Sequence, residues 1–162
     1  MPNPRLLAFF GLALAGVAAF TGLTVWSRWD KHIGINGQFV KVRTAAPTAE
    51  DSLVILDLKL ENPGDLAFQI DEATLTVTPA SGDPVDGIIV AGRDTLRLFD
   101  AYPALGPRGN DPLLMRDIIG AHKTVERMMA FQFPGLPEDK LKARKSLVLK
   151  IHERQGSVHE IK

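Results

Sequence analysis

Apolar and polar residues alternate along four stretches of the chain, with the period of two that is typical of a strand with one buried face. The clearest stretch is SLVILDLKLE, residues 52–61, in which every even position from Val54 to Leu60 is apolar. The others are residues 73–78, 125–133 and 147–152. Turn sequences that contain Pro or Gly separate them, at residues 61–65, 80–87, 133–139 and 154–157. The pattern predicts five to seven short strands in a mainly β, antiparallel β-sandwich.

The N-terminal part of the chain has a different pattern, an uninterrupted apolar run from Leu6 to Trp26. No charged residue lies between Arg5 and Arg28. As a helix, these 21 residues would span about 32 Å at ~1.5 Å per residue, close to the ~30 Å hydrocarbon core of a bilayer. We therefore expect one transmembrane helix over residues 6–26, an uncleaved signal anchor in the cell (inner) membrane.

Two other interpretations of this segment stay open. A cleaved secretory signal usually has an apolar region of about 7–15 residues before a small-x-small site, and Ala13-Leu14-Ala15 offers such a site. We favour the anchor because the apolar run continues well past that site. A buried helix of a soluble protein is the third interpretation, which the lack of a polar face disfavours.

Aromatic and basic residues flank the apolar run, where membrane–water interfaces favour them. These candidate interface residues are Arg5, Trp26, Arg28, Trp29 and Lys31. Arg5 and the amino terminus favour an N-terminus inside the cell, whereas Arg28 and Lys31 favour an N-terminus outside it. We expect a single-pass protein whose C-terminal domain lies outside the cytoplasm.

Small residues recur along the apolar run at spacings of four, three and four. They are Gly11, Ala15, Ala18 and Gly22. On a helix they share one face, which permits close approach of two helices and hence a homodimer. The alternative is that Gly and Ala are simply common in membrane helices.

The organisation that we expect is a tail of residues 1–5, the transmembrane helix 6–26, a linker 27–37 and one domain 38–162. Within this domain, residues 92–120 break the period-two pattern and form a long insertion. Asp94 can cap a short helix there that Pro103 ends, and Asp111 before Pro112 resembles a second helix start. Loops of this length in compact domains are usually functional or have secondary structure of their own.

Two interpretations of the insertion stay open. The one that we favour is a structural lid of helical turns over one end of the sandwich. The other is a binding site for an envelope protein, whose candidate residues are Leu96, Phe99, Tyr102, Arg108 and Met115.

Three stretches of the chain together resemble a known family: VILDLKLENPGDLAFQIDEATLTV, IGAHKTVERMMAFQFPG and SLVLKI. They are similar to the extracytoplasmic immunoglobulin-like domains often called telokin-like, in which an early strand ends at an Asn, here Asn62, and a later one at a Phe-Pro pair, here Phe133-Pro134. Ala121-His122 stands where that pattern usually has Pro-Gly. LENPGDLAFQI is also similar to the water-stress domain of late-embryogenesis-abundant type 2 proteins. The resemblance covers roughly residues 38–155 and implies an immunoglobulin-like sandwich, an extracytoplasmic location and no catalytic residues.

Composition removes several classes of function. The 19 Lys and Arg residues balance 19 Asp and Glu residues, so there is no general attraction to nucleic acid. The absence of Cys excludes disulfides, thiolate metal sites and a Cys nucleophile. The sequence has neither a glycine-rich phosphate loop with the required spacing nor a Gly-x-Ser-x-Gly motif. We therefore expect no cofactor and assign no catalytic residue.

His152 and His159 flank the predicted hairpin turn ERQGSV. A two-residue turn would place them opposite each other, where two imidazoles can hold a divalent metal ion. A three-residue loop that pairs Ile151 with Ile161 matches apolar residues better. We therefore favour solvent-facing histidines and expect no metal site.

Two charged clusters can be interpreted either as binding sites or as ordinary solvent-exposed turns and loops. Asp83 and Asp86 supply two carboxylates, whereas calcium takes six to eight oxygen ligands, so a capped turn is favoured. The segment KLKARK, residues 140–145, could contact an anionic lipid or polymer. A solvated loop between strands is the interpretation that we favour there.

Three hypotheses of function follow. The first is a membrane-anchored, non-catalytic β-sandwich that binds or scaffolds a partner at the cell envelope. The second is an envelope hydrolase or metal-dependent enzyme with residues 92–120 as an active-site lid. The third, from the water-stress resemblance, is a stress-protective domain.

Overall fold

The structure is a computed structural model that describes residues 14, 16–23 and 34–162, and it divides the chain into the units Met1–His32 and Ile33–Lys162. Residues 16–23 are helical. The rest of the expected transmembrane segment, apart from Leu14, lies outside the described residues. Among the residues described, no helix has the length and apolar character that a membrane crossing requires.

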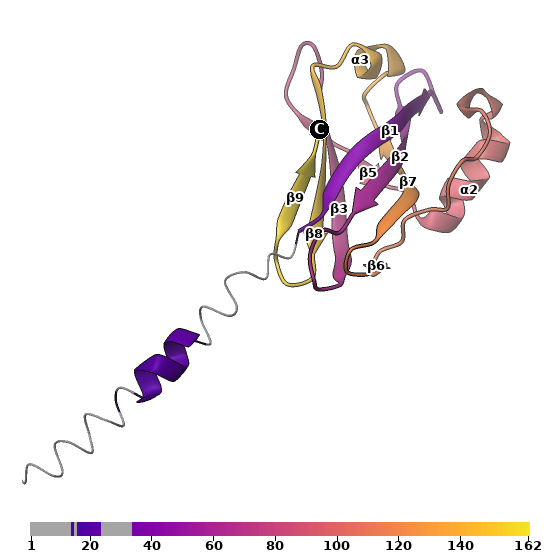
Figure 1. Cartoon of the computed structure of the whole chain (residues 1–162). Coiled ribbons are helices and arrows are strands. Elements are labelled where there is room, and N and C mark those ends of the chain that lie inside the picture. Colours follow the sequence, from indigo (N-terminus) through magenta and orange to yellow (C-terminus); the bar gives the residue numbers. More distant parts are fainter. Residues whose placement is uncertain (1–13, 15, 24–33) are drawn as a thin grey trace, which may run out of the picture. The chain divides into compact units, whose positions relative to one another are not determined.

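The second unit is mainly β, as expected, and contains nine strands in its described part (Figure 1). The strands are β1 (Asn36–Ala45), β2 (Ser52–Glu61), β3 (Phe68–Thr78), β4 (Val85–Asp86), β5 (Ile88–Ile89), β6 (Ile118–Ile119), β7 (Thr124–Phe133), β8 (Ser146–Glu153) and β9 (Val158–Ile161). The helical elements are α2 (Gly92–Ala101), the 3-10 turn η1 (Pro103–Leu105) and α3 (Glu138–Lys142). All four predicted strands are present. β1 was not predicted, and it begins inside the expected linker.

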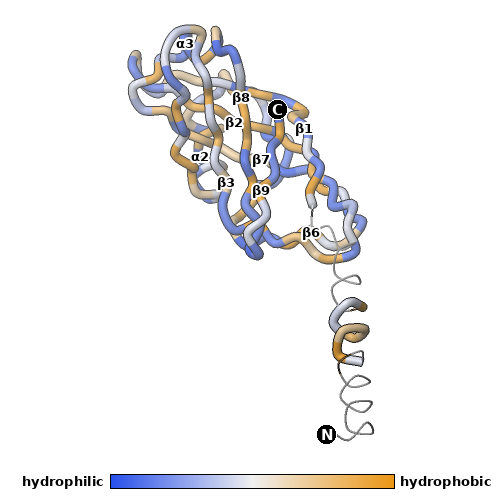
Figure 2. The backbone as a smooth tube through the Cα atoms, turned by 90° about the vertical axis from the view of Figure 1, so that its left-hand side faces the viewer, coloured by the Kyte–Doolittle hydropathy of each residue, from blue (hydrophilic) through white to orange (hydrophobic). Residues whose placement is uncertain are grey.

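The strands form two antiparallel sheets. The first has the order β1-β2-β7-β5, and the second has the order β4-β3-β8-β9 with β6 paired to β3. The main core lies between the sheets, where the even-numbered residues Val54 to Leu60 of β2 meet Leu75 of β3 and Ile151 of β8. Figures 1 and 2 place α3 and β6 at opposite ends of this two-sheet domain.

β2 is buried on both faces, although its sequence alternates. Leu53, Ile55 and Asp57, on the face away from the main core, are at most 3% exposed. A second apolar cluster covers this face, and it includes Leu105 of η1 and Phe99 of α2. Figure 1 shows α2 on the side of the first sheet that faces away from β3, β8 and β9. The part of the insertion that contains α2 and η1 is therefore a third layer on a sheet face, whereas its last residues form β6, which pairs with β3 of the second sheet.

The predicted helix in the insertion is present, but both predicted helix starts are wrong. α2 begins after Ala91 without a side-chain cap, and Asp94 lies in its first turn. No second helix begins at Asp111 and Pro112, because this segment is extended against β7: Met128 N donates to Asp111 O at 3.0 Å. Hydrogen bonding to the strand edge outweighs the local preference of Asp-Pro for a helix start.

Asn62 holds the β2–β3 loop to β6. Its side chain is buried, and its amide nitrogen donates to the carbonyl oxygens of Leu66 and Ile119 at 2.8 and 2.9 Å. Its side-chain oxygen accepts from Gly64 N at 3.0 Å. The Asn at the end of β2 is thus a structural residue that fixes the end of the domain near Gly34.

The β8–β9 hairpin has neither of the two registers considered from the sequence. The observed pairs are Leu149 with Ile161, Lys150 with Glu160, Ile151 with His159 and His152 with Val158. Gly156 has a φ of 97°, a left-handed value that favours Gly, and it closes the turn. The turn lies one residue earlier than the expected three-residue loop, and Ile161 therefore meets Leu149 in place of Ile151.

Candidate functional site

A groove opens between the two sheets, on the side where β1 and β8 lie. It has a volume of about 370 Å³. The residues that line it are Phe39, Val42, Lys142, Arg144, Lys145, Ser146, Leu147 and Lys162. We call it the basic groove, because every charged residue in its lining is a cation.

The floor of the basic groove is apolar. Phe39 and Val42 of β1 and Leu147 of β8 are half-buried and pack against the main core. β9 covers the neighbouring part of the same opening, where Gly37 lies so close to Ile161 that a Cβ at Gly37 would clash with it. In the part of the chain that the structure describes, β9 extends to Ile161, and Ser146 and Lys162 beside it are exposed.

The rim of the basic groove carries four cations, of which two are paired with carboxylates. Lys142 Nζ lies 2.8 Å from Glu138 Oε1, and Lys162 Nζ lies 2.9 Å from Glu160 Oε2. Lys145, within the described part of the chain, has no carboxylate partner. Arg144 has none either and donates to Leu141 O at 3.1 Å. The rim therefore keeps a local positive charge in a protein whose overall charge is balanced.

The two paired carboxylates are stabilised in their charged form. The pKa of Glu138 is lowered from its ordinary value of 4.5, first by the hydrogen bond from Lys142 and then by that from Thr44. The pKa of Glu160 is lowered by Lys162. Both side chains remain ionised near pH 7, so Glu138 holds Lys142 and Glu160 holds Lys162 at the rim of the groove.

Cations beside an apolar floor suit a ligand that has both an anionic and an apolar part. Carboxylate and phosphate groups make charge-assisted hydrogen bonds to Arg and Lys. The apolar floor adds contact area that a purely electrostatic patch lacks. The basic groove is therefore the strongest candidate binding site among the hollows that we compared.

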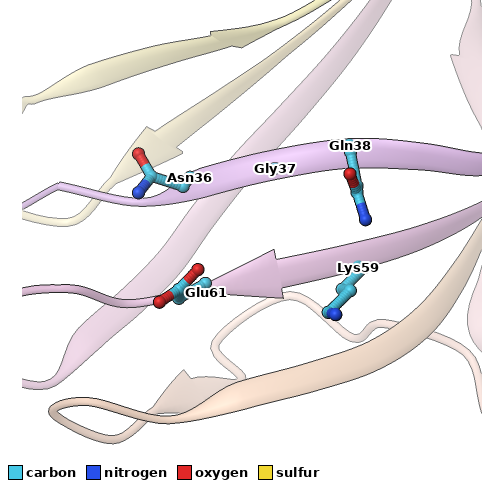
Figure 3. A pocket seen from close by; sticks show the side chains of 5 residues that line it. All are labelled: Asn36, Gly37, Gln38, Lys59 and Glu61. Atoms are coloured by element: carbon cyan, nitrogen blue, oxygen red, sulfur yellow. The ribbon is translucent and has the colours of Figure 1, made fainter.

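A second hollow, of about 270 Å³, lies on the uncovered part of the first sheet. Figure 3 shows its lining, with Asn36 and Gln38 from β1 beside Lys59 and Glu61 from β2. One cation and one anion balance each other there, and no apolar side chain lines the hollow. This composition is typical of a solvated sheet surface.

A third hollow, of about 280 Å³, lies near β6 and the β8–β9 turn. Gln69, Asp71, Arg116 and Arg154 line it, and Arg154 donates to the side-chain oxygen of Gln69 at 3.2 Å. Asp71 offsets part of its positive charge, and it has no apolar floor.

The five candidate partner-binding residues of the insertion have different environments. Leu96, Phe99 and Tyr102 are half-buried and pack against the second apolar cluster. Arg108 and Met115 are exposed, and Arg108 lies 3.2 Å from Asp111. The structure therefore does not bring the five together on one exposed surface, and their role in partner binding stays a prediction.

Arg43 belongs to a buried ion pair within the first sheet and also fixes the insertion to that sheet. Arg43 Nη2 of β1 lies 2.6 Å from Asp57 Oδ2 of β2, and both side chains are less than a tenth exposed. Arg43 Nη1 also donates to the carbonyl oxygens of Leu105 and Pro107, at 3.3 and 2.7 Å. The guanidinium lies 5.3 Å from the ring centre of Phe99. Side chains and hydrogen bonds thus fill the space beneath the insertion.

The candidate interface residues and half of the candidate dimer face lie outside the described residues. This applies to Arg5, Trp26, Arg28, Trp29, Lys31, Gly11 and Ala15. Ala18 and Gly22 belong to the helical residues 16–23. Membrane contact and homodimer formation stay predictions.

The candidate metal ligands do not meet. His152 and His159 occupy successive pairs of the β8–β9 ladder and so point to opposite faces of the sheet. His159 packs edge-on against Phe68, with ring centres 5.5 Å apart. Asp86 accepts a hydrogen bond from Thr76 at 2.6 Å. In the described part of the chain, no three His, Asp or Glu side chains gather as a metal site would require.

Sequence reasoning found part of the basic groove. KLKARK, for which we favoured a solvated loop over contact with an anion, supplies Lys142, Arg144 and Lys145. The floor and Lys162 were missed, because β1 was not predicted and the register of β9 was wrong. The alternation of Val40 and Val42 with Lys41 and Arg43 was the available signal for β1.

Comparisons with known proteins add little. No family model matches the chain, and no curated protein matches it. A solved structure described as the X-ray structure of Northeast Structural Genomics Consortium target SoR45 is similar at 12% sequence identity, over 80% of this chain and 79% of that chain. Its TM-score of 0.32 supports no statement about fold or function.

Proposed function

We propose that the protein is a membrane-anchored, non-catalytic binding module of the cell envelope, and that it holds an anionic ligand in the basic groove. The observation that carries this proposal is the groove itself, in which four cations surround the apolar residues Phe39, Val42 and Leu147. The proposal includes an immunoglobulin-like arrangement of the two sheets, which the sequence resemblance implies.

The packing of the insertion favours a binding module over an enzyme with a lid. A lid enzyme needs space for a substrate beneath residues 92–120. Leu105, Phe99 and the Arg43–Asp57 pair occupy the interface there. Opening it would break the hydrogen bonds from Arg43 to the carbonyl oxygens of Leu105 and Pro107 and would expose the Arg43–Asp57 pair to water.

The position of the groove suits a ligand outside the membrane. Gly34 lies at the β6 end of the domain, and the cations of α3 and its following loop lie at the other end. Six residue steps of β1 lead from Asn36 to Val42, about 20 Å at ~3.3 Å per residue. The chain therefore enters the domain at the Gly34 end, away from the cations of α3 and its following loop.

Binding of a glutamate-rich peptide tests this function. The full chain, reconstituted in phosphatidylcholine nanodiscs, is titrated with the peptide in calorimetry. We expect Lys145→Glu with Lys162→Glu to weaken binding at least tenfold at low ionic strength, because two attractive charges become repulsive.

The matched control is Arg93→Glu with Arg97→Glu, which makes the same change in net charge on the exposed face of α2. This control should change the affinity by less than threefold. If both double variants lost the same amount of peptide affinity, binding would depend only on net charge, and the proposed site would be wrong.

A further inference from the structure

The basic groove contains an unpaired strand edge. β9 pairs with β8 only as far as Leu149, whereas β8 begins three residues earlier, at Ser146. On its other side, β8 pairs with β3 along Ser146, Leu147 and Val148. Among the residues that the structure describes, no strand pairs with the outer edge of these three residues, and the register of β9 places only Lys162 beside them, opposite Val148.

Backbone groups on such an edge favour another strand. In an antiparallel ladder the N–H and C=O groups point alternately to the two sides, so this edge presents donors and acceptors for a further strand. Proteins usually protect such edges with bulges, charges or covering segments. Here lysines flank the edge, but the space beside it is the groove.

The other strand edge at the groove is less suited to pairing. β1 is the outermost strand of the first sheet, and its register shifts between Phe39 and Lys41. Val40 is exposed at this irregularity. A bulge interrupts the regular spacing of backbone groups, so an added strand would pair more regularly with β8.

The surroundings of the β8 edge define the side chains of an added strand. Side chains alternate between the two faces of a strand, and Leu147 points to the core side of β8. A residue opposite Leu147 would therefore lie over the apolar floor formed with Phe39. Its neighbours would lie near the cations Lys145 and Lys162, which favour carboxylates.

From this geometry we propose that the occupant of the groove is an extended peptide segment with alternating acidic and apolar side chains, which pairs with the edge of β8 at Ser146 and Leu147, beyond the end of β9. The proposal rests on the proposed function and names the partner class for the same site. Main-chain hydrogen bonds supply the binding, and the floor and rim select the side chains.

Peptides with altered backbones test this proposal. The probe is a seven-residue peptide of alternating Glu and Val, added to the full chain in phosphatidylcholine nanodiscs. Two further peptides carry N-methyl groups on one or the other set of alternate residues, which removes the donors along one edge without changing charge. Affinity is measured by calorimetry, and hydrogen exchange reports the amides of residues 146 and 147.

The expected result is binding of the parent peptide, slower exchange of amides at Ser146 and Leu147, and at least a tenfold loss of affinity for one N-methylated form. Equal binding of all three peptides without slower exchange would overturn strand pairing and leave the anion-binding function intact. No binding of the parent peptide would also overturn strand pairing.

Two further outcomes separate the occupant from the site. If phosphatidylglycerol vesicles bind through Lys145 and Lys162 while the peptide does not, the occupant is a lipid and the peptide proposal is wrong. If Lys145→Glu with Lys162→Glu leaves peptide affinity unchanged, both this proposal and the proposed function fail.

Discussion

Substitutions at the Arg43–Asp57 ion pair should show whether the insertion is a fixed layer or a lid, because Arg43 also donates hydrogen bonds to the insertion. We expect Arg43→Met alone, or Asp57→Leu alone, to destabilise the domain by about 3–5 kcal/mol, because each leaves one buried charge without its partner. Arg43→Met also removes the donor to Leu105 and Pro107. Such a loss is a large share of the ~5–15 kcal/mol that typically separates folded from unfolded domains.

The double variant Arg43→Met with Asp57→Leu should have a free energy of unfolding much closer to that of the wild type than the sum of the two single losses implies. Replacing both members of a buried pair by apolar residues is often neutral or stabilising. A double-mutant cycle from urea unfolding, followed by circular dichroism, gives the coupling between the two sites. A suitable control is Arg97→Met, since the Arg97–Asp94 pair is mostly exposed, and its loss should cost less than about 1 kcal/mol.

A probe in the insertion separates local detachment from global unfolding. Tyr102 is the sole tyrosine of the chain, so fluorotyrosine labels the insertion alone. In the single variants the fluorine resonance should shift toward the position found in unfolded protein, under conditions in which β2 and β7 remain protected from hydrogen exchange. The account of a fixed third layer would be refuted if Arg43→Met and Asp57→Leu each lowered the free energy of unfolding by less than about 1 kcal/mol and their effects simply added in the double variant.

Three further predictions concern other parts of the domain. Asn62→Ala should cost about 2–4 kcal/mol in urea unfolding, because one buried backbone group, Ile119 O, and three half-buried ones lose their partner, at about 1–3 kcal/mol for a buried group; a cost under 1 kcal/mol would contradict this. Glu138→Gln should lower stability at pH 6, and this difference should shrink as the pH falls below 4.5. The pKa of Glu138 is lowered in the folded state, so its contribution is present above 4.5 and disappears as the pH falls through the folded value; a difference that does not shrink below pH 4.5 would argue against it. Gly87→Ala should cost about 1–3 kcal/mol, since its Cβ would lie 2.6 Å from Phe133 Cζ, and an unchanged melting temperature would show that the ring can move.

The strands of the domain were largely predictable, because burial against a sheet imposes a period of two. β2 and β7 match the expected stretches to within a residue. β1 was missed since its register shift near Val40 interrupts the alternation, and its start contains Gly37. A bulge is determined by the partner strand, which local sequence does not reveal.

Asp57 shows the limit of the alternation pattern. In a sandwich of two sheets, a charged residue that alternates with apolar ones indicates a strand face exposed to solvent. Here Asp57 is 3% exposed, because Arg43 neutralises it and the insertion covers both. Arg43 belongs to another strand and Leu105 to a distant turn, so the burial of Asp57 depends on contacts that no local pattern encodes.

The groove was predictable only as a cluster of charge. KLKARK is visible in the sequence, but a site also needs the floor from β1 and β8 and the position at which β9 ends. That position depends on the turn at Gly156, and an error of one residue in the loop moved the expected partner of Ile161.

The central claim, that an anionic ligand binds in the basic groove, is tested most directly by its location on the protein. Isotope-labelled full chain is titrated with the alternating Glu-Val peptide, and backbone amide shifts are recorded. The account predicts that the largest changes occur at residues 39–42, 142–148 and 162. Changes centred on Asn36, Lys59 and Glu61, or on residues 92–115, would contradict it.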